Sequence, residues 1–129
     1  MLVKLMLIAG GGAVGALLRF ALSTWAQGLT KSDFPLGTLL VNTLGCFAIG
    51  ICAAYFSGPV LVREELRPAL VIGLLGAFTT FSTFGYETFE LMNEKQFTLA
   101  GLNVLLSNTL GLAGVWCGYR LSQVIGIGG

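Results

Sequence analysis

Four hydroxyl side chains within five positions form the densest set of chemically useful groups in the chain. They are Thr79, Thr80, Ser82 and Thr83, and they follow glycines in an apolar stretch. Threonine and serine hydroxyls bond to backbone carbonyls and compete with a helix's own hydrogen bonds. We therefore expect the helix that carries them to break near its middle, where the backbone must be buried or line a cavity. The alternative is a continuous helix whose hydroxyls bond back one turn.

Phe81 and Phe84 lie in the same stretch, three residues apart and therefore on one face of a helix. An aromatic ring is electropositive at its edge and negative on its face. Two rings presented edge-on would attract a small anion without holding it as tightly as a cationic side chain. Phenylalanines in a membrane helix more often pack or face lipid, but the neighbouring hydroxyls favour an ion-binding role here.

Two further polar residues lie inside apolar stretches. Asn42 is flanked by leucine and valine, and an amide in hydrocarbon is costly unless it is hydrogen-bonded or faces water. It serves either as a hydrogen bond between helices or as a donor to an ion. Arg19 either extends to the membrane surface or lines a vestibule that attracts anions.

Polar residues of the last apolar stretch share one face. Asn103, Ser107 and Gly111 are four residues apart, and Asn108 and Thr109 lie beside them. Residues at this spacing lie one above another on a helix. This face is either a polar seam or a packing seam, and composition alone does not separate the two.

The charged residues exclude several classes of function. Glu87, Glu90 and Glu94 share a face at the end of their stretch and are expected at the water interface. An acid at mid-membrane is absent, which disfavours a proton-coupled exchanger. The chain has no histidine and no nucleophile beside a base, so it is not expected to be an enzyme. A net charge of +1 gives no electrostatic footprint for nucleic acid.

The overall composition indicates that lipid surrounds these groups. The 129 residues are 55% hydrophobic and 10% charged, with a mean hydropathy of +0.86, whereas soluble domains carry about a quarter charged residues. About 20 apolar residues in a helix span the bilayer. The sequence predicts one all-α membrane domain over residues 1–129. Its four helices are expected at about 5–25, 36–56, 66–92 and 98–121.

The distribution of lysine and arginine leaves the orientation open. Four helices place the two termini and the second connector on one side. Of the seven basic residues, this side carries Lys4, Arg63, Arg67 and Arg120, and the other side carries Arg19, Lys31 and Lys95. Orientation follows an excess of positive charge on one side, and four against three is hardly an excess. Either a weakly biased single topology or insertion both ways up is consistent with this count.

Glycine is abundant, at 19 residues, and gathers within the expected helices, for example at Gly10, Gly11, Gly12 and Gly15. Small residues let transmembrane backbones approach closely, because packing rather than hydrophobicity drives their association in lipid. A chain this short encloses little space alone, so we also interpret the glycines as a sign of a dimer. The cysteines Cys46, Cys52 and Cys117 are interpreted as small packing residues.

Three segments, in order and at compatible spacing, resemble the Fluc (CrcB) family of microbial fluoride channels. The first runs from Gly12 to Phe20, the second from Pro35 to Asn42, and the third from Gly73 to Phe84. The run Thr-Thr-Phe-Ser-Thr-Phe is the specific part, whereas a glycine motif alone is weak. Length and helix number agree along the whole chain.

The resemblance implies a passive fluoride channel in the cell (inner) membrane, built as an antiparallel, dual-topology homodimer with two pores. It implies that fluoride meets residues of the second, third and fourth helices, which are Asn42, Thr80, Phe81, Ser82, Thr83, Phe84 and Asn108. It also implies a central Na⁺ held by the carbonyls of Gly76 and Thr79, and a vestibule arginine at Arg19. Glu87 matches an acid that the family carries just past the motif.

Two positions depart from the family's pattern. Ala77 stands where the third helix often has a second glycine, and Leu112 and Trp116 interrupt the hydroxyl track expected after Asn108 on the fourth helix. The alternative function is a small four-helix multidrug or cation exporter of dual topology. Such an exporter needs a glutamate in its first helix, and the first helix here has no acid.

Overall fold

Every regular element that the structure describes is helical, as the composition predicts. The computed structural model describes residues 1–58 and 62–126. In chain order the elements are α1 (Leu2–Gly28), α2 (Leu36–Ser57), α3 (Leu66–Pro68), the π-helical η1 (Ala69–Leu75), α4 (Gly76–Phe78), α5 (Phe81–Asn93) and α6 (Phe97–Val124). Together α3 to α5 make one interrupted helix over Leu66–Asn93, so the described part of the chain has four helices long and apolar enough to cross a membrane. It is therefore a multi-pass membrane protein.

The predicted helix ends lie within three residues of the observed ends. The first helix extends to Leu2 and Gly28, and the last extends to Val124. A helix spanning the bilayer can continue for a turn into the headgroup region, where composition gives no sharp signal. Of the second connector, residues 59–61 lie outside the part described.

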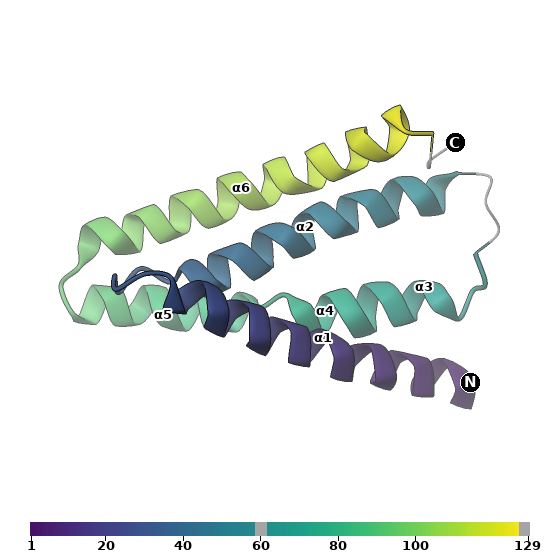
Figure 1. Cartoon of the computed structure of the whole chain (residues 1–129), viewed down its shortest axis with the longest axis horizontal. Coiled ribbons are helices and arrows are strands. Elements are labelled where there is room, and N and C mark those ends of the chain that lie inside the picture. Colours follow the sequence, from purple (N-terminus) through teal and green to yellow (C-terminus); the bar gives the residue numbers. More distant parts are fainter. Residues whose placement is uncertain (59–61, 127–129) are drawn as a thin grey trace.

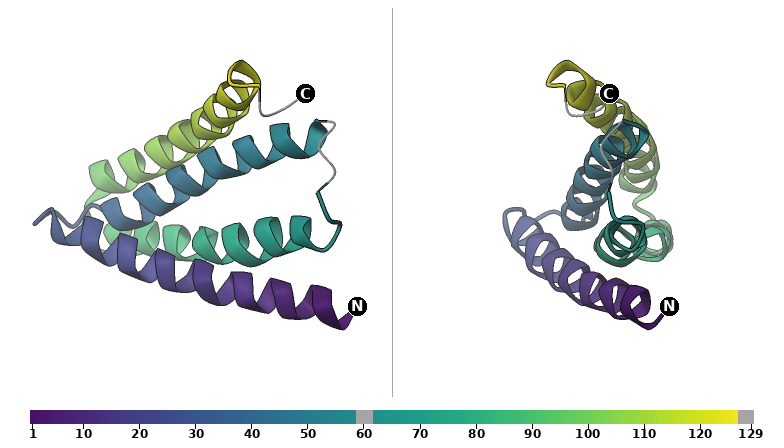
Figure 2. Two further views of the ribbon diagram at one scale, coloured as in Figure 1. Left: turned by 45° about the vertical axis from the view of Figure 1, so that its right-hand side comes forward. Right: turned by 90° about the vertical axis from the view of Figure 1, so that its right-hand side faces the viewer.

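The four helices form two pairs, which Figures 1 and 2 show from different directions. One pair consists of α2 and α6, which pack along most of their length. In the other pair, α1 lies against η1 and α4. The start of α1 and the last turn of α6 lie at the same end of the molecule, and the α1–α2 and α5–α6 connectors lie at the opposite end.

Glycines lie where the paired helices approach most closely, as the sequence predicts. A Cβ at Gly118 of α6 would collide with the backbone oxygen of Phe47 on α2. A Cβ at Gly11 of α1 would lie 2.6 Å from the backbone oxygen of Ala69 on η1. Because only glycine allows these backbones to meet, the glycines set the spacing within each pair.

The predicted break in the third helix is present and falls at Thr79 and Thr80. Both residues are extended, with φ and ψ of −94° and 159° at Thr79 and −152° and 116° at Thr80. The break separates η1 and α4 on one side from α5 on the other. The continuous-helix alternative is therefore wrong for this chain.

Candidate functional site

A pocket of about 340 Å³ lies beside the helix break; we call it the central pocket. It is lined from α2, η1, α4, the break, α5 and α6 by Asn42, Gly45, Cys46, Ile49, Val71, Leu75, Gly76, Thr79, Thr80, Phe81, Phe84, Ser107 and Asn108. None of these side chains carries a charge. Seven of the ten site residues expected from the sequence therefore border one cavity.

Phe81 and Phe84 lie on one face of α5, as their spacing predicts. Their ring centroids are 5.5 Å apart and the ring planes are inclined by 44°. Phe81 is 83% exposed within the single chain. A large aromatic ring so exposed, beside a polar break, is available to contact an ion or another molecule.

The hydroxyl groups divide into two kinds. Thr79 Oγ1 donates to the Leu75 carbonyl at 3.0 Å, which is the bond back by one turn that the alternative prediction described. Thr80 instead caps α5, because its Oγ1 accepts from the Thr83 backbone N–H at 3.2 Å. The same oxygen donates to Thr83 Oγ1 at 3.0 Å and lies 3.3 Å from Ser82 Oγ. Thr80 is thus the centre of the cluster.

Asn42 bonds both sides of the Thr80 backbone. Its Nδ2 donates to the Thr80 carbonyl at 2.9 Å, and its Oδ1 accepts from the Thr80 N–H at 2.8 Å. The interhelical role that the sequence left open is therefore observed. The amide also lines the central pocket, and its nitrogen carries a second hydrogen that these two bonds do not use.

The break frees the two backbone carbonyls that the sequence singled out. In a continuous helix the Thr80 N–H would bond the Gly76 carbonyl, but it donates to Asn42. The Thr83 N–H would bond the Thr79 carbonyl, but it donates to the Thr80 hydroxyl. Both carbonyl oxygens are left without their usual helical donor, which is the condition under which backbone oxygen can coordinate a cation.

Arg19 lies beside the break. It is half-buried on α1, and its Nη1 lies 3.5 Å from the Thr79 carbonyl oxygen. This distance is the outer limit of a hydrogen bond. This contact is the direction that the vestibule alternative describes for this side chain.

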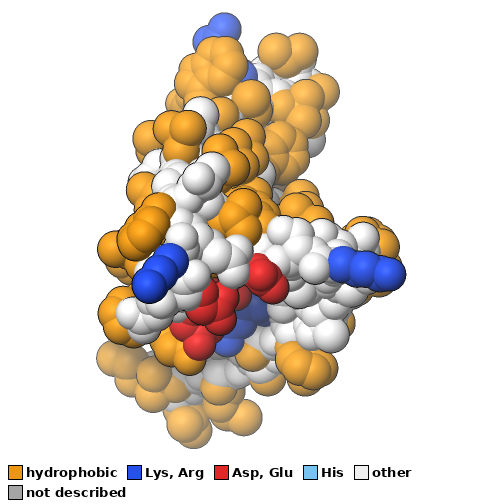
Figure 3. All heavy atoms as spheres, turned by 90° about the vertical axis from the view of Figure 1, so that its left-hand side faces the viewer, with side chains coloured by type: hydrophobic (Ala, Val, Ile, Leu, Met, Phe, Trp, Pro, Cys, Tyr) orange, Lys and Arg blue, Asp and Glu red, His pale blue; other side chains and the backbone are white. Residues whose placement is uncertain are grey.

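An acidic pocket of about 420 Å³ lies at the end of the molecule that carries the α1–α2 and α5–α6 connectors. Its carboxylates are Asp33, Glu87, Glu90 and Glu94, and Thr38 and Thr83 also line it. Figure 3 shows the acidic side chains gathered near the middle of this end. The three glutamates share a face as predicted, and we call this cavity the acidic end pocket.

The Glu87 carboxyl group is hydrogen-bonded and partly buried, unlike a carboxylate at the protein surface. Its Oε1 accepts from Thr38 Oγ1 at 2.7 Å, whereas its Oε2 is buried without a partner among the described residues. Thr38 was not singled out from the sequence. The sequence feature that could have identified Thr38 is its position four residues before Asn42, because this spacing places both polar side chains on one face of α2.

The polar face of α6 serves partly for packing. Asn103 is buried and its Nδ2 donates to Thr88 Oγ1 on α5 at 2.9 Å, while Ser107 Oγ donates to Asn103 Oδ1 at 3.3 Å. Asn108 lines the central pocket, but its Nδ2 donates back to the Val104 carbonyl at 2.7 Å. The seam is therefore a packing seam that reaches the central pocket at Ser107 and Asn108.

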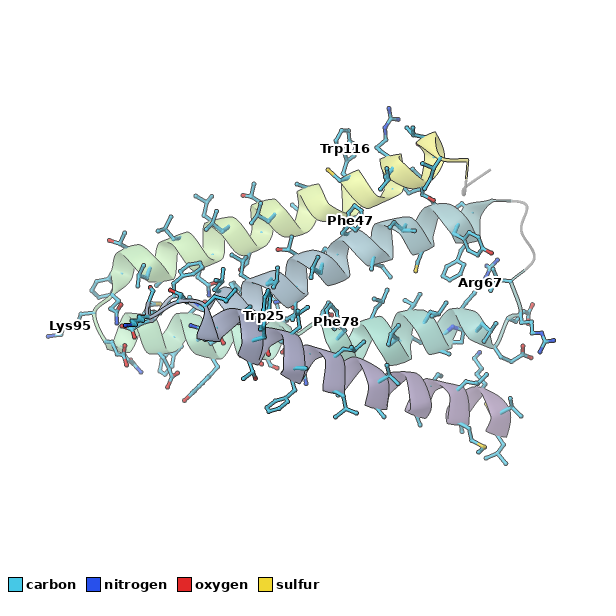
Figure 4. All side chains as sticks on the ribbon, in the orientation of Figure 1. Trp25, Phe47, Arg67, Phe78, Lys95 and Trp116 are labelled. Atoms are coloured by element: carbon cyan, nitrogen blue, oxygen red, sulfur yellow. The ribbon has the colours of Figure 1, made fainter. Side chains whose placement is uncertain are left out.

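The two residues that interrupt the fourth-helix track face outward. Leu112 is 74% exposed and Trp116 is 65% exposed, and Figure 4 shows Trp116 pointing away from α2. Three of the ten expected site residues do not line the central pocket: Thr83 lines the acidic end pocket, and Arg19 and Ser82 line neither.

Comparison with known proteins places these features in a family. Residues 6–119 match the family described as CrcB-like protein, Camphor Resistance (CrcB). The chain is 42% identical to the Fluoride-specific ion channel FluC of Nitrosococcus oceani, over 95% of this chain and 98% of that protein. It is 46% identical to the Fluoride-specific ion channel FluC of Geobacter sulfurreducens, over 90% of this chain and 94% of that protein.

Proposed function

The chain belongs to the CrcB-like family, and from that premise we propose that it is a fluoride-selective ion channel. It lets fluoride leave the cell passively and so relieves fluoride toxicity. The observation that carries this function is the central pocket, where two phenylalanine rings, an asparagine amide and a threonine hydroxyl meet without any charged side chain.

This pocket suits the chemistry of fluoride. A small, strongly hydrated anion enters a narrow pore only where compact donors replace its water, and it leaves only where they do not hold it too tightly. Ring edges, amides and hydroxyls meet both conditions, because they offer positive ends of dipoles rather than full charges. The proposed fluoride contacts are Asn42, Thr80, Phe81, Ser82, Thr83, Phe84 and Asn108, with Arg19 attracting the anion.

A multidrug or cation exporter is not favoured. Its exchange of a cation for a proton needs a carboxylate at membrane depth, and α1 contains none. The curated relatives carry the name of a fluoride-specific channel. A channel needs no catalytic residues, which agrees with the absence of an enzymatic constellation in the sequence.

The functional unit is proposed to be an antiparallel homodimer in the cell (inner) membrane. Support comes from the exposure of Phe81 and from a pocket open on the side of the single chain. Support also comes from the near balance of basic residues at the two ends, of which Arg67 and Lys95 are labelled in Figure 4. A second copy, inverted across a two-fold axis in the membrane plane, would close the pocket.

A structural Na⁺ at the dimer axis is proposed to bind the carbonyls of Gly76 and Thr79. The residues present fit such an ion, since both oxygens have lost their helical donors to Asn42 and Thr80. Sodium prefers oxygen ligands, and two copies of the chain would supply four. When bound, the ion would offset the partial negative charge of these carbonyl oxygens.

The first expected result is selectivity for fluoride over chloride. Purified protein in liposomes loaded with either halide should release fluoride at least about tenfold faster, which corresponds to a barrier difference of about 1.4 kcal/mol. The physical reason is that the larger chloride cannot be surrounded by the same compact donors. Protein-free liposomes give the background, and chloride efflux at a comparable rate would reject the proposal.

The second expected result concerns orientation. A reporter fused to the C-terminus should be found on both sides of the membrane in roughly equal amounts, because four basic residues face three. Two lysines added to the 93–97 connector should bias insertion one way and reduce fluoride export. Export should return when a copy of opposite bias is co-expressed. A wild-type reporter confined to one side would rule out dual insertion.

A further inference from the structure

Two polar side chains of α2 hold α5 at two points. Asn42 bonds the backbone of Thr80 just before α5 begins, and Thr38 bonds the carboxyl group of Glu87, seven residues further on. Thr38 and Asn42 are four residues apart on α2, and Thr80 and Glu87 are two helical turns apart. The spacing therefore matches a single face of each helix.

The contact at Asn42 replaces the helical bonds of Thr80 on both sides. A side-chain amide that both donates to and accepts from one residue pairs with it as a neighbouring β-strand would. The pairing favours the extended conformation observed at Thr80, with φ −152° and ψ 116°. It also removes the Thr80 N–H from competition for the Gly76 carbonyl. Without Asn42, that N–H would have to find another acceptor or remain unpaired, which is unfavourable for a buried backbone group.

The position of α5 depends on these two contacts from α2. Apart from its bonds to α2, α5 joins the described structure mainly through α6, where Asn103 donates to Thr88. Phe81 and Phe84 occupy the first turn of α5, directly after the residue that Asn42 holds. The rotation of this turn about its axis decides where both rings point. A change at Thr38 would reach the rings only by moving the helix, since Thr38 does not line the central pocket.

We propose that Thr38 and Asn42 are positioning residues: a two-point clamp from α2 that holds the break open and sets the direction of the Phe81 and Phe84 rings. Asn42 holds the Thr80 backbone through its oxygen and one of its N–H groups, which leaves its second N–H for the ion. The flux readout for this clamp rests on the proposed fluoride channel, whereas the ring positions can be measured independently.

Thr38→Val is the decisive variant. Valine has nearly the shape of threonine and lacks only the hydroxyl, so the bond to Glu87 is removed without a cavity. Full-length protein labelled with 4-fluorophenylalanine gives ¹⁹F resonances for the rings, and the Phe81→Leu and Phe84→Leu proteins assign two of them. In Thr38→Val we expect these two resonances to shift or broaden, while those of Phe20 and Phe47 stay in place. Fluoride efflux should fall about tenfold, the scale of one lost hydrogen bond to a carboxyl group.

Matched variants make the test specific. Thr38→Ser keeps the hydroxyl and should restore both the spectrum and the efflux. Thr43→Val makes the same isosteric change one residue beyond Asn42, at a side chain with no hydrogen bond among the described residues, and should change neither. Asn42→Leu should move the same two resonances further. If the Asn42→Leu protein does not fold, the Thr38→Val spectrum alone tests the clamp.

Each outcome separates the clamp from other roles. Unmoved ring resonances in Thr38→Val would overturn the clamp, even if efflux fell, since Thr38 would then act at the acidic end pocket. Wild-type protein that carries no fluoride would instead reject the proposed function, and the spectra would still show whether α2 positions the rings.

Discussion

Replacing Phe81 or Phe84 with isoleucine is expected to remove most fluoride flux while leaving a folded dimer. Isoleucine keeps an apolar side chain of useful size but has no ring quadrupole to present to an anion. Both rings border the central pocket, 5.5 Å apart. A role in packing alone predicts a loss of stability of about 1–2 kcal/mol, with flux retained by the protein that folds.

The measurement pairs size-exclusion chromatography with fluoride efflux from liposomes. The pore interpretation predicts normal elution and a flux near that of protein-free liposomes for each variant. Phe20, which is 71% exposed on α1, and Phe47, on the α2 face toward α6, are the controls and should tolerate the same change. Near-normal flux in both Phe81→Ile and Phe84→Ile would remove these residues from the site.

Gly118→Ala is expected to destabilise the fold more than any other single-methyl change in α6. An added Cβ would meet the backbone oxygen of Phe47 on α2, which cannot rotate away as a side chain can. The α2–α6 pair would have to separate along its length, and overpacking of this kind costs about 3 kcal/mol. Thermal unfolding in detergent, followed by the loss of monodisperse protein, measures the effect.

Gly101 is the matched control on the same helix. A Cβ there meets nothing within 4 Å, so Gly101→Ala should be neutral or slightly stabilising, because alanine favours the helix by about 1 kcal/mol over glycine. Gly50→Ala, whose Cβ would meet the Val115 backbone oxygen from the other side of the pair, should behave like Gly118→Ala. A Gly118→Ala protein as stable as wild type would mean that the two helices do not depend on this contact.

The sequence predicted the elements because the membrane leaves few alternatives. In hydrocarbon every backbone polar group must be bonded internally, so each apolar stretch of about 20 residues has to be a helix. Local chemistry also predicted an interruption within the hydroxyl cluster of the third helix, since clustered hydroxyls and preceding glycines weaken a helix there. The shared face of Phe81 and Phe84 followed from helical spacing alone.

The partners of the polar side chains depended on tertiary structure. From the sequence, Asn42 was equally a link between helices or a donor to the pore, and only the packing of α2 against the break brings its amide to Thr80. Arg19 reaches the Thr79 carbonyl at the break, and Asn108 bonds its own helix. Such pairings depend on how each helix is rotated and crossed against its neighbours, which residues far apart in the chain decide together. Periodicity along one helix carries no information about that rotation, and so the elements were predictable while the bonds between them were not.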